Sequence, residues 1–194
     1  ELKMTLFEAL TAARQKIDRL DARLLLQYAT GCSHTDLLAR PETPVSVPAC
    51  AQFAEWVERR AAGEPLAYLV GTKDFHGLSL QVDARVLVPR PDTEVIVDWA
   101  LELLHTDLAE RAEPAVIDLG TGSGAIALAV KRGCPRAEVH GVDISAAALD
   151  VARRNGARLG LAEHAHLSHL IFAARTSGLM AMRAADELPD FLSG

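Results

Sequence analysis

The chain has 194 residues, 49% of them hydrophobic, and its 20 basic and 26 acidic side chains give a net charge of −6. This composition suits one or two domains with a buried core. It offers no basic stripe for direct nucleic-acid binding, no uncharged run near the ~18 residues of a membrane span, and no signal-peptide core in its first residues. Three scattered cysteines, Cys32, Cys50 and Cys134, are typical of reduced thiols and predict a cytoplasmic protein.

The N-terminal third predicts a small helical domain. Apolar residues recur at helical spacing between residues 6 and 28, before Gly31, which predicts one or two amphipathic helices. The proline-punctuated stretch RPETPVSVP predicts a link, and a further helix is expected over residues 51–62.

The pattern then changes to that of an α/β protein. Between Leu66 and Val88 apolar and polar residues alternate, which predicts a β-hairpin or a short extended connector. The stretch PRPDTEVIVDWALELL predicts a helix capped by Asp92 or Thr93. A strand, helix, strand, helix series follows over residues 115–159, the pattern of a parallel α/β sheet.

The stretch VIDLGTGSGAIALAV, residues 116–130, predicts a strand, a glycine-rich turn and a helix. In doubly wound sheets such a turn binds ligands, because glycine permits positive φ and close approach to the main chain. We expect free amides at Ser123, Gly124 and Ala125, facing a polar or anionic group of the ligand.

Two cofactors fit this turn. The spacing Gly120-x-Gly122-x-x-Ala125 matches the dinucleotide fingerprint, and Asp143 ends the next apolar run, where it could accept hydrogen bonds from a ribose. That spacing favours a nicotinamide cofactor. Asp118 instead favours S-adenosylmethionine, because a carboxylate repels a pyrophosphate and attracts an ammonium and a sulfonium. A turn with no ligand is disfavoured, because three spaced glycines cost stability.

Four segments carry more specific motifs: AGEPLAYLVGTKDFHG (62–77), LVPRPDTE (87–94), DLGTGSGAIALA (118–129) and GVDISAAALDVARRNGARLGL (141–161). They resemble the release-factor glutamine methyltransferases, the HemK/PrmC family, over about residues 5–161. The glycine motif alone indicates only a Rossmann-like methyltransferase, whereas PRPDTE together with GEPLAY is far more specific.

The resemblance implies an α/β fold in which an incomplete Rossmann-like methyltransferase domain follows a small all-α N-terminal domain and a β-hairpin linker. The expected boundaries are residues 1–63 for the helical domain, which would recognise substrate, 64–90 for the linker, and 91–194 for the partial S-adenosylmethionine-binding domain.

The implied activity is methyl transfer from S-adenosylmethionine to the side-chain nitrogen of the glutamine in the Gly-Gly-Gln motif of peptide chain release factors, the expected partners. The implied cofactor-binding residues are Asp118, Gly120, Thr121, Gly122, Ser123, Gly124 and Asp143. In this assignment the glycine turn wraps the methionine part, Asp118 attracts its ammonium and Asp143 holds the ribose hydroxyls. Arg90, Asp92, Thr93 and Glu94 would lie beside the cofactor, or would equally form a proline turn and helix cap.

Catalytic residues stay unassigned, because the family's Asn-Pro-Pro-Tyr motif, which binds the glutamine amide, does not occur in these 194 residues. The single asparagine, Asn155, precedes Gly156 in the stretch RRNGARLGL (153–161), which predicts a helix end with an asparagine or a glycine in a left-handed turn. After Leu161 the sequence shows neither a third strand ending in an acid nor the strand that would carry the catalytic motif, and the remaining sequence is too short for a seven-stranded doubly wound sheet, which needs ~150 residues. The sequence therefore suggests a chain that is truncated or altered after about residue 161.

The tail holds three neighbouring histidines, His164, His166 and His169. No cysteine lies nearby and Glu163 is the only neighbouring acid, so no metal is expected, and the histidines predict a solvated helix face or a disordered end. Two classes of function stay open: an enzyme of this family with uncertain activity, or a non-catalytic binding module with a partial cofactor cleft. A nicotinamide-dependent oxidoreductase is a third alternative, which Asp118 disfavours.

Overall fold

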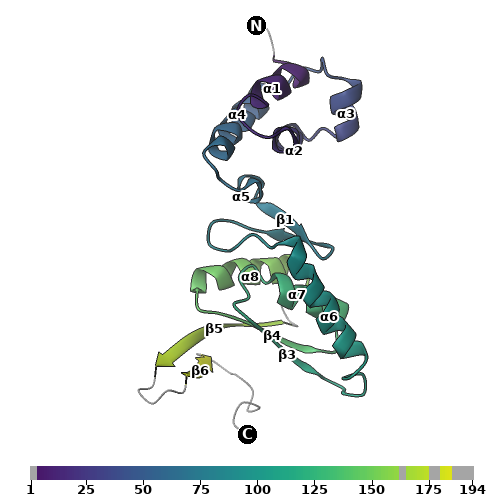
Figure 1. Ribbon diagram of the computed structural model, residues 1–194, viewed down its shortest axis with the longest axis vertical. Helices are drawn as coiled ribbons and strands as arrows, with labels where there is room; N and C mark the ends of the chain where they lie inside the picture. Colours follow the sequence, from purple (N-terminus) through teal and green to yellow (C-terminus); the bar gives the residue numbers. More distant parts are fainter. Residues whose placement is uncertain (1–3, 162–164, 175–179, 185–194) are drawn as a thin grey trace. The chain divides into compact units, whose positions relative to one another are not determined.

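A computed structural model describes residues 4–161, 165–174 and 180–184 (Figure 1). Contacts between residues divide the chain into two compact units, residues 1–71 and residues 72–194. None of the helices in these described ranges is long and apolar enough to cross a membrane.

The described part of the first unit is a bundle of short helices. Its elements are α1 (Leu6–Ala13), α2 (Arg19–Thr30), α3 (His34–Ala39), α4 (Val47–Ala61) and α5 (Leu66–Val70). Side chains of Thr5, Asp18, Ser33 and Ser46 accept a hydrogen bond from the first turn of α1 to α4, which satisfies amides that the helix itself leaves unpaired. The apolar faces meet in one core.

Two predictions for this unit need correction. The helix expected over residues 51–62 begins earlier, at Val47, because Ser46 caps it and Pro48 fits its first turn. Residues 66–70, expected to open the hairpin, form α5 instead. Five residues are too few to separate a period of two from one helical turn, and the left-handed Gly71 ends the helix before the strand begins.

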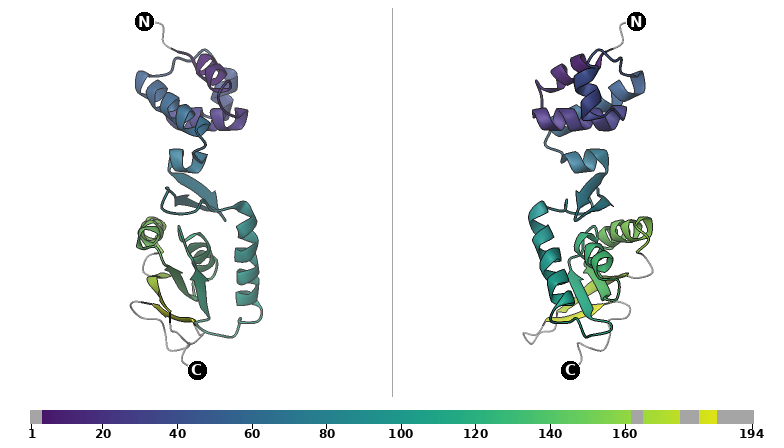
Figure 2. Two further views of the ribbon diagram at one scale, coloured as in Figure 1. Left: turned by 60° about the vertical axis from the view of Figure 1, so that its left-hand side comes forward. Right: turned by 90° about the vertical axis from the view of Figure 1, so that its right-hand side faces the viewer.

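The second unit opens with a β-hairpin made of β1 (Thr72–Phe75) and β2 (Leu78–Gln81), paired antiparallel. Its two-residue turn, His76–Gly77, has positive φ at both positions, as a tight hairpin of this length favours. The predicted alternation is confirmed, because Leu78 and Leu80 are buried while Ser79 and Gln81 are exposed. Figure 2 shows the hairpin beside α8 (Ala146–Arg158) and the start of α6 (Glu94–His105).

A short 3-10 turn (Pro91–Thr93) leads into α6 (Glu94–His105). Thr93 occupies the N-cap position, as predicted, but its side chain makes no capping hydrogen bond. The α/β series then runs β3 (Ala115–Leu119), α7 (Ala125–Gly133), β4 (Glu138–Asp143), α8 (Ala146–Arg158), β5 (Ala165–Ala174) and β6 (Met180–Ala184).

The strands form a sheet in the order β3-β4-β5-β6. β3, β4 and β5 are parallel, whereas β6 pairs antiparallel with β5. β5 therefore supplies a third parallel strand, although it does not end in an acid. His166 and His169 lie on β5 rather than on a helix or a disordered end, because pairing with β4 overrides a weak local pattern; His164 lies outside the described residues.

The core of the second unit joins the hairpin to the sheet layer. Phe75, Leu78 and Leu80 of the hairpin are buried in one cluster with Val97 of α6 and Val139 of β4. The hairpin is thus fixed against the elements that carry the glycine turn, and its residues can line the same site.

One face of this unit stays apolar and exposed. Within the described ranges β3 has β4 as its only strand partner. Leu119, the last residue of β3, is 59% exposed, and Trp99 on α6 is 61% exposed. These side chains border a groove of about 330 Å³ between α6, β3 and α7.

Candidate functional site

Residues Gly120–Gly124, the glycine turn, connect β3 to α7 and fold back against β4. The amides of Gly120 and Thr121 both donate to the carbonyl of Val142, at 2.8 and 3.0 Å. All three glycines have positive φ, as the strand-to-helix turn requires. The turn therefore lies at the carboxyl ends of two parallel strands, where α/β sheets bind ligands.

Two of the three amides expected to be free are available. Those of Ser123 and Ala125 donate to no acceptor in the part of the chain that the structure describes. The prediction was wrong for Gly124, whose amide donates to the carbonyl of Thr121 at 2.8 Å. The turn satisfies this amide itself because it bends tightly before the helix begins.

Asp118, on β3, directs a partly buried carboxylate toward the turn. Its Oδ2 atom accepts hydrogen bonds from Thr121 Oγ1 at 2.7 Å and from the amide of Ala127 at 3.2 Å. Its Oδ1 atom receives none from the described residues. Burial raises the pKa of Asp118, the two hydrogen bonds oppose that rise, and the nearby Asp143 adds to it. The site therefore disfavours a carboxylate anion that lacks a cationic partner.

Asp143, at the end of β4, ties the turn to the start of α8. Its Oδ2 accepts the amide of Gly122 at 2.9 Å, and its Oδ1 accepts the amide of Ser145 at 2.9 Å. The residue is only 9% exposed. An ionised carboxylate has about four acceptor sites, so two amides leave capacity for a ligand hydroxyl.

A cavity of about 360 Å³, the turn cavity, adjoins the glycine turn. Its polar lining includes Asp118, the turn residues 120–123, Arg90 and Thr93. Phe75, Leu87, Val88, Pro89, Ala125 and Ile126 complete the wall. Gly124 and Asp143 are not among the residues that line the cavity. The sequence-based assignment missed the apolar wall, although the buried alternation of the hairpin was a signal that its side chains face the core.

The four candidate residues within the PRPDTE motif (89–94), Arg90, Asp92, Thr93 and Glu94, separate in the structure. Arg90 and Thr93 line the turn cavity, whereas Asp92 and Glu94 do not. Glu94 Oε1 accepts the amide of His76 at 3.0 Å and so holds the hairpin turn against α6. Part of the motif thus lines the cavity, and Glu94 holds the hairpin turn in place.

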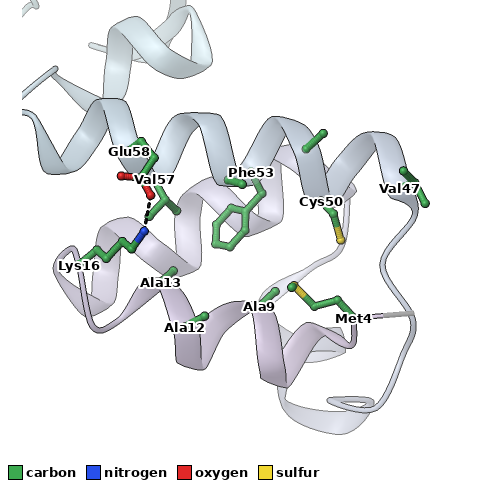
Figure 3. A pocket seen from close by; sticks show the side chains of 12 residues that line it. Met4, Ala9, Ala12, Ala13, Lys16, Val47, Cys50, Phe53, Val57 and Glu58 are labelled. Carbon is green, nitrogen blue, oxygen red and sulfur yellow. Dashed lines mark hydrogen bonds and ion pairs between the residues drawn. The ribbon is translucent and has the colours of Figure 1, made fainter. Parts of the chain in front are cut away.

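The chain has a larger cavity in its first unit, between α1 and α4, of about 420 Å³ (Figure 3). Its lining is almost wholly apolar, with several alanines and Phe53, and an ion pair between Lys16 and Glu58 crosses it at one side (Figure 3). It offers neither a glycine turn nor a buried carboxylate with an open acceptor. The turn cavity is therefore the better candidate for cofactor chemistry.

Asn155 does not end a helix. It lies inside α8, which continues to Arg158, and it is completely buried. The predicted helix end within residues 153–161 is confirmed, because α8 ends at Arg158 and Gly160 has the left-handed φ; Asn155 itself lies inside the helix, where its side chain has partners within the fold.

Comparison with known families matches two segments. Residues 2–71 match the PrmC N-terminal domain, and residues 93–177 match the methyltransferase small domain. The first match ends at the residue where the first compact unit ends.

Three curated relatives carry the name release factor glutamine methyltransferase. That of Bordetella pertussis is 48% identical over 157 residues, 81% of this chain and 56% of the relative. That of Burkholderia pseudomallei is 46% identical over 74% of this chain and 49% of the relative. That of Agrobacterium fabrum is 43% identical over 81% and 57%. The chain spans about half the length of the curated relatives it matches.

Among solved structures, the N-terminal domain of human METTL16 in complex with SAH gives a TM-score of 0.43 at 14% identity, over 80% of this chain and 56% of that one, a likeness too weak to bear on function. The observed elements confirm the predicted α/β class with its N-terminal helical region. Over the residues that these family and sequence matches cover, the chain belongs to the release factor glutamine methyltransferase family.

Proposed function

We propose that the turn cavity binds S-adenosylmethionine, and that the protein to which this chain corresponds methylates the Gly-Gly-Gln glutamine of peptide chain release factors. The observation that carries the proposal is Asp118, a partly buried carboxylate that lines the cavity with one oxygen open. Family membership and the names of the relatives support the reaction and the protein substrate. We extend the proposal to a cytoplasmic location, where release factors meet the ribosome.

The residues present suit the charges of this cofactor. S-adenosylmethionine carries an ammonium and a sulfonium, and a cation beside Asp118 would offset the cost of burying its carboxylate. The available amides of Ser123 and Ala125 suit the carboxylate of the methionine part. A dinucleotide would instead bring a pyrophosphate toward Asp118, so the nicotinamide alternative is less favourable.

Further roles follow from position. Asp143 does not line the turn cavity, but at the end of β4, where it binds the amide of Gly122, it would accept ribose hydroxyls with the acceptor sites that its two amide partners leave open. Phe75 and Leu87 would cover the less polar parts of the cofactor. Arg90 and Thr93 would lie at the cavity wall beside it. When bound, the cofactor supplies an electrophilic methyl group.

The glutamine nitrogen needs help from the protein, because its lone pair is delocalised into the amide. Acceptors that hold its N–H groups would align the nitrogen with the methyl carbon, and such positioning supplies most of the rate. Neither Asn-Pro-Pro-Tyr nor a second asparagine occurs in the 194 residues, and Asn155 is buried within α8. We therefore assign no catalytic acceptor to the described residues.

Calorimetry on the 194-residue chain tests the cofactor. S-adenosylhomocysteine should bind at least about tenfold more tightly than NAD, and Asp143→Ala should weaken it by about 1–3 kcal/mol through lost hydrogen bonds. Asp150→Ala, which removes a carboxylate from the exposed side of α8, is the matched control and should bind normally. Tighter binding of NAD would overturn the assignment.

A second candidate is a binding module without chemistry, which the missing Asn-Pro-Pro-Tyr motif favours. Incubation with a release factor and labelled S-adenosylmethionine separates the two. We expect this chain to label the glutamine ~10² to 10⁴ times more slowly than a full-length relative, because the acceptors orient and polarise the amide. Equal labelling would show that the acceptors lie among residues of this chain.

A further inference from the structure

We infer that Asn155 is a positioning residue that sets the conformation of the glycine turn. The importance of that turn rests on the proposed cofactor site, whereas the structural role of Asn155 does not. Its side chain bridges three elements that are distant in sequence, namely α8, the end of β2 and the glycine turn.

The amide of Asn155 is fully buried and well satisfied. Its Oδ1 accepts the backbone amide of Gln81 at 2.7 Å. Its Nδ2 donates to the carbonyl of Gln81 at 2.9 Å and to the carbonyl of Ser123 at 2.9 Å. Both Nδ2 hydrogens therefore have acceptors. These two hydrogen bonds occupy the main-chain groups of Gln81 as a neighbouring strand would, so they hold the end of β2 against α8.

The hydrogen bond to Ser123 acts together with that of Asp143 to fix the main chain of the glycine turn. Asp143 holds the amide of Gly122, and Asn155 holds the carbonyl of Ser123, one residue further along. The amide of Ser123, one of the two that stay available, lies between these fixed atoms. The direction of that amide is thus set by two side chains, one at the end of β4 and one in α8, that do not themselves line the turn cavity.

Only an amide of this length can make all three bonds. Aspartate keeps an acceptor for Gln81 but loses both donors, and it places a carboxylate oxygen against two carbonyl oxygens. Leucine has a similar volume but leaves three backbone groups without partners, which is costly in a buried site. Alanine opens a small void without introducing a charge.

Hydrogen exchange on the ligand-free chain tests this role directly. Asn155→Asp should speed exchange of the hydrogen-bonded turn amides, those of residues 120–122 and 124, and of the Gln81 amide by at least about tenfold more than the rest of the unit. The control is Leu104→Ala, which removes buried side-chain volume from α6. Leu104 does not line the turn cavity. This variant should speed exchange across the unit without singling out the turn. If Asn155→Asp does not fold, Asn155→Ala is measured in the same way.

Binding of S-adenosylhomocysteine supplies the functional readout. Compared at matched loss of stability, the Asn155 variant should bind at least about tenfold more weakly than the Leu104→Ala control, because the turn amides no longer face the ligand. Uniform exchange together with equal affinity in the two variants would overturn the inference. If the unchanged chain binds no S-adenosylhomocysteine, the proposed function fails, and the exchange pattern alone decides whether Asn155 positions the turn.

Discussion

Replacing Asp118 by asparagine should stabilise the ligand-free chain and weaken its binding of S-adenosylmethionine. Burial raises the pKa of Asp118 above its ordinary value of 3.8. Between the ordinary and the raised value the folded state binds more protons than the unfolded state, so the free energy of unfolding falls as pH rises through that window. At every pH above that window the free energy of unfolding stays lowered by the full amount. Asparagine cannot ionise, so it avoids this loss of stability, and its side-chain oxygen can still accept hydrogen bonds from Thr121 and Ala127.

The expected loss of affinity follows from the open Oδ1 atom of Asp118. One charge-assisted hydrogen bond from the ligand ammonium contributes about 1.5–3 kcal/mol, which corresponds to a roughly 10- to 150-fold weaker Kd. The neutral Nδ2 group of asparagine would point a donor at a cation, so we expect the loss to lie toward the upper end of that range.

Two assays separate these effects. Urea denaturation at pH 7 should give a higher free energy of unfolding for Asp118→Asn, and the difference should vanish when the pH falls below the ordinary value of 3.8. Calorimetry compares S-adenosylmethionine with S-adenosylhomocysteine, which has the ammonium but no sulfonium. Equal weakening of both ligands places Asp118 at the ammonium, and weakening of S-adenosylmethionine alone places it at the sulfonium. Unchanged affinity for both, with lower stability at pH 7, would refute the reasoning.

Three further predictions concern stability and association. Gly124→Ala should lower the free energy of unfolding by about 2–3 kcal/mol, because its φ is +81° and a Cβ there would lie 3.0 Å from a leucine side chain. Gly120→Ala has open space around the new Cβ and should lower it by only about 1 kcal/mol, so equal urea midpoints for the two variants would contradict this prediction. Hydrogen bonding by Arg85 lowers the pKa of Asp83 from 3.8 to about 2, so its contribution to stability should be lost as pH falls through that window, and Arg85→Ala should abolish that part of an acid titration. Trp99→Glu should reduce self-association in light scattering, since Trp99 is 61% exposed beside an edge strand; unchanged particle size would show that this face is not adhesive.

The sequence by itself determined the features that depend on neighbouring residues. Alternation over residues 78–82 predicted the inner face of the hairpin, because successive side chains of a strand point to opposite faces. The spacing of glycines after Asp118 predicted a strand-to-helix turn, because few other residues adopt positive φ. Resemblance to a family then suggested which cofactor this turn would hold.

Only the tertiary structure decided which of these residues meet. Asn155, which lies in a stretch predicted to end a helix, is buried inside α8 because Gln81 and Ser123 offer it partners from distant segments. Glu94 anchors the hairpin turn rather than lining the cavity, because His76 lies within reach of its carboxylate. β5 forms a strand because β4 supplies the hydrogen-bonding edge. In each case the deciding partner is distant in sequence, so no local pattern records it.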